Sequence, residues 1–190
     1  MSVMINENTE NKMHPQKFAL YLGIASIIML FAALTSAYIV RSHQNDWIVF
    51  TLPRIFWINT LIIALSSATM QWAVFSFKKY QYGNYKIALA LTVSLAIAFT
   101  FGQYEGWLKL ASIGMFLDGN PAGSFIYVIS FIHLLHIFGG LVFLISSLVR
   151  SLYKQFNPNK FLYVQLMATY WHFVGILWLY LMIFFTIKIA

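Results

Sequence analysis

The sequence predicts an all-α membrane protein, a bundle of five transmembrane helices with the N-terminus in the cytoplasm and the C-terminus outside. Two observations indicate this fold class. Hydrophobic residues make up 61% of the 190 residues and charged residues only 9%, against about 25% charged residues in soluble domains. The uncharged residues also gather in long runs, and roughly 20 apolar residues let a helix cross a bilayer.

Five such runs follow one another along the chain. They are Phe18–Val40, Ile55–Phe77, Ile87–Tyr104, Ser124–Val149 and Phe161–Ile187. Strands of a membrane barrel would be about 10 residues long with strict alternation, a pattern that is not seen. We expect residues 1–14 to be a polar tail and residues 15–190 to be a single membrane domain, because no linker divides them.

The first three runs show how the helices are expected to pack. Small residues stand four apart in the first two runs, as in Ala32 and Ser36 or Ala64 and Ala68, and such pairs permit close helix contact in lipid. The third run is the shortest. The apolar segment GWLKLASIGMFL that follows it predicts either a longer helix or a segment lying on the membrane surface.

The fourth and fifth runs carry the histidines of the predicted membrane region. His133 and His136 are three residues apart and therefore share one helix face. Gly139 and Gly140 follow them and permit another helix to approach closely. The fifth run adds His172. A short connection joins the two runs, so we expect them to be neighbours, with all three rings at similar depth and close to one another.

Lysine and arginine residues predict the orientation. Eight of the 12 lie on the side of the N-terminus or in the connections expected on that side, and four lie on the other side. Cytoplasmic segments carry the excess of positive residues. These charges stand at helix ends and form no basic stripe, so we expect no nucleic-acid partner despite the net charge of +7.

Three imidazoles at one depth suit a transition metal, and two suit a haem iron. Metal-binding histidines usually have carboxylate partners, however, and no acid lies clearly inside a run. We therefore favour neutral, structural histidines at His133, His136 and His172. A free-standing intramembrane metal- or haem-binding protein is the alternative. A small transporter is a third possibility, but the inverted repeats or broken helices expected of one are not found.

Two charged residues near helix ends are further candidates. Glu105 is either a proton-conducting carboxylate or an interfacial acid beside an aromatic belt of Tyr104 and Trp107, and we favour the second. Arg150 ends the fourth run on the predicted cytoplasmic side, where a guanidinium suits a lipid phosphate.

The chain has no cysteine, which excludes disulfides and thiolate metal sites. No nucleophile–base pair, phosphate loop or nucleotide fingerprint is present.

Four segments also have a recognisable pattern and order. They are MLFAALTSAY at Met29–Tyr38, FWINTLIIALSSAT at Phe56–Thr69, GSFIYVISFIHLLHIFGG at Gly123–Gly140 and YWHFVGILWLYLMIF at Tyr170–Phe184. Together they resemble subunit III of the haem–copper oxygen reductases, that is, of cytochrome c oxidase, in its five-helix bacterial form without the first two of seven helices. The positions that match family motifs include Asn59, Gln103, Trp107 and Trp171. Arg150 falls at the spacing of the family's lipid-contacting arginine.

The sequence departs from the family at its acidic positions. Ile27 stands where the family has a buried glutamate. Gly106 stands where the family has an acid, and Glu105 is one place earlier. Gln165 stands in place of a glutamate, and Gly175 in place of an aspartate. Leu134 also replaces the glycine between the two histidines. These losses weaken the expectation of a proton-handling role for this chain, and they leave packing and lipid roles intact.

The resemblance implies a non-catalytic accessory subunit of a bacterial cytochrome c oxidase in the aerobic respiratory chain. It implies a multi-pass protein of the inner membrane that packs against subunit I as its main contact, with subunit II and other oxidase subunits nearby. It also implies bound phospholipids and support of the turnover of a proton-pumping enzyme. No catalytic residue, haem or copper is expected in this chain, because the haems and copper are expected in subunits I and II.

Overall fold

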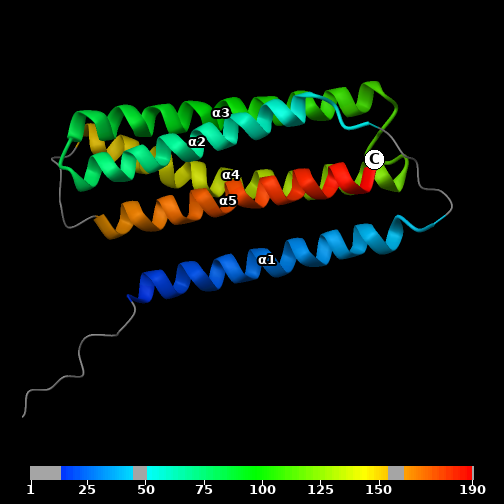
Figure 1. The fold of residues 1–190 in the computed structure, drawn as a ribbon, viewed down its shortest axis with the longest axis horizontal. Helices are drawn as coiled ribbons and strands as arrows, with labels where there is room; N and C mark the ends of the chain where they lie inside the picture. Colours follow the sequence, from blue (N-terminus) through cyan, green and yellow to red (C-terminus); the bar gives the residue numbers. More distant parts are fainter. Residues whose placement is uncertain (1–13, 45–50, 154–160, 190) are drawn as a thin grey trace, which may run out of the picture.

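The computed structural model describes residues 14–44, 51–153 and 161–189, and these residues form five long helices (Figure 1). Their bounds are α1 Pro15–Arg41, α2 Ile55–Lys78, α3 Tyr82–Ser112, α4 Pro121–Tyr153 and α5 Phe161–Ile189. Each helix is long and apolar enough to cross a bilayer. The described residues contain no strand, so the predicted all-α class with five transmembrane helices is confirmed. The expected tail at residues 1–14 lies, except for His14, outside the described residues.

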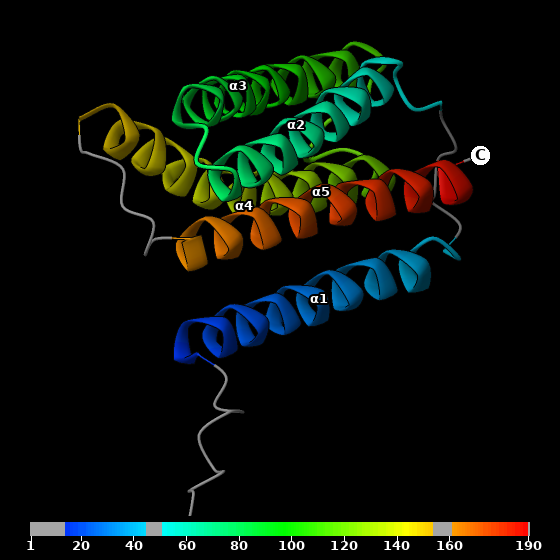
Figure 2. The same cartoon turned by 60° about the vertical axis from the view of Figure 1, so that its left-hand side comes forward.

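Four of the helices enclose the core. α2 and α3 form an antiparallel pair, and α5 packs on α2 while α4 packs on α3 (Figures 1 and 2). Among the described helices, α1 contacts only α4 and α5 and runs along the outside of the bundle. The helices alternate in direction, so α1 begins at the opposite end from the one where α5 ends. The side of the membrane on which each end lies stays a prediction.

α3 is longer than the predicted run Ile87–Tyr104, because its later turns still pack against α2. Gly106 is buried, and a Cβ added there would lie 3.1 Å from Phe56 Cζ. Glu105 and Lys109 are both exposed on the outer side of these turns. The charges therefore interrupt the uncharged run without ending the helix. The segment after Tyr104 continues α3 as far as Ser112, which was one of the two predicted possibilities.

A backbone cap ends α3. The N–H of Gly114 donates to the carbonyl of Ala111 at 3.0 Å, and the N–H of Met115 donates to the carbonyl of Leu110 at 3.1 Å. Gly114 has a φ of 83°, which costs little for a residue without Cβ. Met115 and Leu110 are both buried, as is usual for the apolar pair of a Schellman motif. This cap turns the chain back toward α4.

The same hydrogen-bond pattern ends α2, although a tyrosine takes the place of the glycine. The N–H of Tyr80 donates to the carbonyl of Phe77, and the N–H of Gln81 donates to the carbonyl of Ser76 at 2.9 Å. Tyr80 has a φ of 59°, in the left-handed region that disfavours a side chain by about 1–2 kcal/mol. The tight turn that sets α3 beside α2 therefore forms at a conformational cost.

Candidate functional site

Two hydroxyl groups inside the bundle, those of Thr60 and Ser130, each bond to two helices. Thr60 and Ser130 donate to backbone carbonyls four residues earlier in their own helices, at 2.8 and 2.6 Å. This bond satisfies the O–H and leaves the oxygen lone pairs to accept from elsewhere. Trp178 Nε1 of α5 donates to Thr60 Oγ1 at 3.1 Å, and Trp107 Nε1 of α3 donates to Ser130 Oγ at 2.9 Å. These bonds join α5 to α2 and α3 to α4.

A related contact links three helices near the middle of the bundle. Trp171 Nε1 of α5 donates to Ser66 Oγ of α2 at 3.1 Å, and Ser66 Oγ donates in turn to the backbone carbonyl of Thr92 in α3 at 3.3 Å. The Thr92 hydroxyl also lies 2.9 Å from the Thr69 hydroxyl of α2. Ser66, Thr92 and the Trp171 ring are buried. Polar bonds thus connect α2, α3 and α5 where water cannot reach them.

His172 joins α5 to α2. Its Nε2 lies 3.0 Å from Gln71 Oε1, and its Nδ1 is hydrogen-bonded to the Ser67 hydroxyl. A neutral imidazole has one N–H and one bare nitrogen. Nε2–H therefore donates to the amide oxygen, and Nδ1 accepts from the hydroxyl. Both ring nitrogens of His172 therefore have hydrogen-bond partners on α2.

His133 lies in a pocket of aromatic rings. Its ring centroid is 5.1 Å from that of Trp178 and 6.2 Å from those of Phe31 and Phe99. These three rings belong to α5, α1 and α3, so His133 occupies the point where four helices meet. The side chain is fully buried, and neither ring nitrogen has a hydrogen-bond partner among the described residues.

His136 faces α1. Its ring centroid lies 5.7 Å from that of Phe31, and its Nδ1 donates to the carbonyl of Ile132 in the same helix at 2.8 Å. His133 and His136 therefore meet at Phe31, whereas His172 makes its bonds with α2. The expected approach of all three rings is corrected to a pair and a separate histidine. The sequence predicts that His172 lies at a depth in the membrane similar to that of His133 and His136, but it does not show which side of α5 carries His172. The described residues contain no group of three His, Cys, Asp or Glu side chains placed to hold a metal.

The four family-motif positions all face the interior. Asn59 and Gln103 are fully buried, Trp171 is 1% exposed, and Trp107 is partly buried. The N–H of Trp107 points into the bundle toward Ser130, and its place in an interfacial belt stays a prediction. Tyr104, by contrast, is 56% exposed.

The positions at which the family's acids are missing have different surroundings. Gln165 and Glu105 are exposed on the outside of the bundle, and Gly175 is buried with a Cβ position 3.8 Å from Ile63. Gly106 packs on Phe56. Ile27 is partly buried and faces a cavity between α1 and the rest of the bundle.

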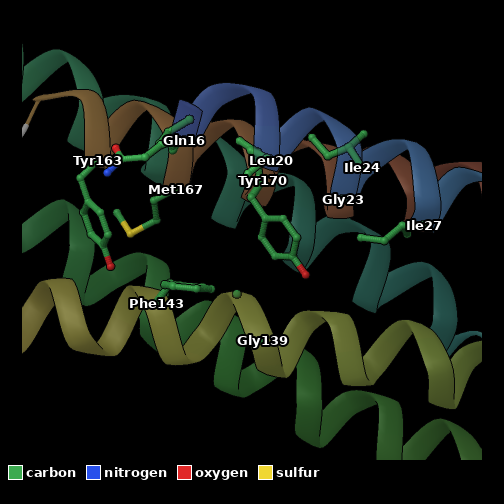
Figure 3. A pocket seen from close by; sticks show the side chains of 13 residues that line it. Gln16, Leu20, Gly23, Ile24, Ile27, Gly139, Phe143, Tyr163, Met167 and Tyr170 are labelled. Carbon is green, nitrogen blue, oxygen red and sulfur yellow. The ribbon is translucent and has the colours of Figure 1, made fainter. Parts of the chain in front are cut away.

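This cavity is apolar and lies in the half of the bundle where α1 and α5 begin and α4 ends (Figure 3). Its volume is about 520 Å³, within the roughly 300–1,000 Å³ of small-molecule pockets. The lining residues are Gln16, Ala19, Leu20, Gly23, Ile24 and Ile27 from α1, Gly139, Gly140 and Phe143 from α4, and Tyr163, Leu166, Met167 and Tyr170 from α5.

The two tyrosines of the cavity wall use their hydroxyls on α4. Tyr170 Oη donates to the carbonyl of His136 at 3.0 Å, and Tyr163 Oη lies 3.5 Å from Ser146 Oγ. Figure 3 shows both side chains reaching from α5 toward α4. Because their polar ends are engaged there, the tyrosines present mainly ring carbons to the cavity.

Arg150 lies near this cavity and is exposed. Its Cζ is 5.9 Å from the centroid of the Tyr163 ring, a cation–π contact. Tyr163 itself lines the cavity. A positive charge is thus held beside an apolar space at one end of the bundle.

Sequence reasoning did not identify Thr60, Ser66 and Thr92 as the partners of the buried groups. A hydroxyl in an apolar run gives no sign of which neighbouring helix it serves. Trp171 and Trp178 in an otherwise apolar helix were the sign that such partners exist, because a buried indole N–H usually has a hydrogen-bond acceptor.

The fold and its buried polar bonds define a multi-pass helical membrane protein whose helices are joined by indole, hydroxyl and imidazole groups. A family model described as cytochrome c oxidase subunit III matches residues 4–188. The chain therefore belongs to the cytochrome c oxidase subunit III family, as the four sequence segments predicted.

Individual relatives support this assignment. The chain is 36% identical over 129 residues to a probable cytochrome c oxidase subunit 3 of Rickettsia felis, covering 67% of this chain and 45% of the relative. It is 29% identical over 160 residues to one of Mycobacterium leprae, covering 82% and 79%. It is 34% identical over 125 residues to cytochrome c oxidase subunit 3 of Locusta migratoria, covering 65% and 46%. The aligned part thus spans less than half of the Rickettsia and Locusta proteins and about four fifths of the mycobacterial one.

Proposed function

We propose that this chain is a non-catalytic accessory subunit of a bacterial cytochrome c oxidase in the inner membrane. It packs against subunit I, with subunit II and other oxidase subunits nearby, and supports sustained turnover of the proton-pumping enzyme. The haems and copper belong to subunits I and II. The observation that carries this proposal is the family match over residues 4–188.

The geometry of the interior is consistent with a packing role. The indoles of Trp171 and Trp178 and the imidazole of His172 are used for bonds between helices. Such bonds are each worth about 0.5–1.5 kcal/mol net. No described observation favours a free-standing metal or haem protein, because His172 uses both nitrogens on α2 and lies apart from the pair of His133 and His136.

Purification from the host membrane tests the proposal. An affinity tag after Ala190 is expected to retain the haem-containing oxidase subunits together with this chain. An oxidase isolated from a strain lacking the chain should keep its haem spectrum and lose activity faster during continuous turnover. Retention of the tagged chain without any haem-containing subunit, or an unchanged activity decay in its absence, would contradict the proposal.

We further propose that Arg150 and the cavity beside Tyr163 hold one phospholipid. The guanidinium binds the phosphate, since it is exposed at a helix end and presents a planar fork of donors. An acyl chain lies in the apolar cavity between α1, α4 and α5. Each buried CH₂ stabilises such binding by about 0.8 kcal/mol, so the cavity contributes affinity that the charge alone does not.

Two variants separate the contributions to lipid binding. Arg150→Ala removes the phosphate partner, and Gly23→Leu fills the cavity, because a Cβ at Gly23 meets nothing within 4 Å. Gly83→Leu is the matched control, since Gly83 is also helical with nothing within 4 Å of its Cβ and is not among the cavity residues. Native mass spectrometry of the oxidase should show less retained phospholipid with either of the first two variants and no loss with the control. Unchanged lipid in both Arg150→Ala and Gly23→Leu would refute the site.

A further inference from the structure

Within the part of the chain that the structure describes, three buried polar side chains of the bundle have no hydrogen-bond partner. They are Asn59 of α2, Gln103 of α3 and His133 of α4, each with a side chain that is fully buried. Among the described residues, none of their side-chain nitrogens and oxygens is hydrogen-bonded to another protein group. Buried polar atoms are nearly always bonded in native proteins, to the chain or to ordered water. Three such residues on three adjoining helices therefore require a common explanation.

The contacts around Gln103 place these residues next to one another. On α3, Gln103 is flanked one turn away on either side by Phe99 and Trp107. Phe99 contacts the His133 ring, with centroids 6.2 Å apart, and Trp107 donates to Ser130 at 2.9 Å. Ser130 and His133 are three residues apart on α4 and share a face. Gln103 therefore faces the turn of α4 that carries His133.

Asn59 reaches the same level of the bundle from α2. A Cβ added to Gly102 would lie 2.0 Å from Asn59 Oδ1, so the amide occupies the space beside the Gly102 backbone. Gly102 immediately precedes Gln103. The neighbour of Asn59, Thr60, receives the hydrogen bond of Trp178, whose ring in turn contacts His133. The three side chains thus surround one region between α2, α3 and α4.

We infer that Asn59, Gln103 and His133 form a site for internal water that joins α2, α3 and α4. The two amides supply four N–H donors and two carbonyl oxygens, and a neutral imidazole adds one donor and one acceptor. A buried water typically makes about three hydrogen bonds, both donating and accepting, and this balanced set provides them. The three groups are neutral, which suits water better than an ion, because a charge at this depth of the membrane is costly.

The site explains why position 102 carries a glycine. Gly102 is required because any larger residue would displace the Asn59 amide from the region. The Trp107–Ser130 bond and the Trp178–Thr60 bond lie on either side, so the nearest hydroxyls already have partners and are not the groups that satisfy the amides. The site consists only of side chains of this chain, whereas the tests below use the oxidase complex of the proposed function.

A cryo-EM map of the assembled oxidase at a resolution that shows ordered water tests the inference. We expect at least one density peak within hydrogen-bond distance of two of the three side chains. Direct bonds among the Asn59, Gln103 and His133 side chains with no density between them would overturn it. So would a tightly packed region in which the three groups have no density within bonding distance.

A pair of variants gives an independent readout. Gln103→Met keeps nearly the same shape and removes the amide, so the water peak should be lost and the oxidase should release this chain at a lower temperature. Thr100→Val is the control on the same helix, because among the described residues Thr100 Oγ1 bonds only to the carbonyl of Ala96 in its own helix. The map of this variant should keep the peak. A peak that persists unchanged in Gln103→Met would contradict the assignment of Gln103 to the site.

Discussion

At the scale of single residues, Gly140 shows how closely α4 and α5 approach. A Cβ added there would lie 2.9 Å from Trp171 Cζ3 and 3.0 Å from Tyr170 Cε1. Trp171 is held by its bond to Ser66, so its ring cannot move away without breaking a buried hydrogen bond. Gly139, one residue earlier, is exposed, and the Tyr170 hydroxyl, at 3.7 Å, is the one described group near its Cβ position.

This difference in packing between Gly140 and Gly139 predicts different effects of an alanine at the two positions. Gly140→Ala should lower the stability of the subunit by about 1–3 kcal/mol, as overpacking of a buried contact does, and should weaken its retention in the oxidase. Gly139→Ala should have little effect. Thermal release of the chain from the purified complex measures both. Equal behaviour of the two variants would show that α4 and α5 do not pack through Gly140.

The residue scale is also where sequence reasoning reached its limit. The glycine pair and the depth of the histidines follow from periodicity, and the close approach at Gly140 agrees with that prediction. The partners of His172 did not follow from the sequence, because a helix position gives depth but not rotation toward a particular neighbour. Asn59 and Gln103 were noted only as motif positions, and their lack of partners appears only when α2, α3 and α4 are assembled.

At the scale of helices, the ends were the least predictable parts. The uncharged run Ile87–Tyr104 identified α3 correctly but ended before its last turns, because Glu105 and Lys109 lie on the outer face. The true end is a backbone feature, the left-handed Gly114. Charge marks where a helix leaves apolar surroundings, whereas the cap marks where its hydrogen bonding stops.

Two alanine substitutions in the region of α3 test the importance of this cap. Gly114→Ala places a Cβ on a residue with φ of 83° and should reduce stability by about 1 kcal/mol or more. Gly83→Ala lies within the first turn of α3, where nothing is within 4 Å of the added Cβ, and should not reduce stability. Melting of the detergent-solubilised complex is the measurement. A loss for Gly83→Ala as large as that for Gly114→Ala would rule out the cap as the cause.

At the scale of the whole molecule, five spans place the beginning of α1 and the end of α5 at opposite ends of the bundle. Composition and run length were sufficient to predict this arrangement, because the bilayer permits few alternatives to apolar helices. The order in which helices neighbour one another was predicted only for α4 and α5. The lack of contact between α1 and α2 among the described helices was not visible in the sequence, in which residues 42–54 connect the two.

The distribution of positive residues predicts which end is cytoplasmic. A reporter that is active only outside the cytoplasm, fused after Ala190, should be active, and a cytoplasmic reporter at the same place should be silent. The same two reporters fused in the connection at residues 79–81 should give the opposite result, because that turn lies at the other end of the bundle. Cytoplasmic activity after Ala190 would reject the predicted orientation.

The position of α1 also has a consequence for the synthesis of the protein. α1 is the first of the five helices to leave the ribosome, yet its contacts are with α4 and α5, the last two. At about 5–20 residues per second, roughly 100 residues of further translation keep it waiting on the order of ten seconds. During that time α1 must remain in the bilayer without its contacts to α4 and α5. α1 is apolar and long enough to remain in lipid until its partners arrive.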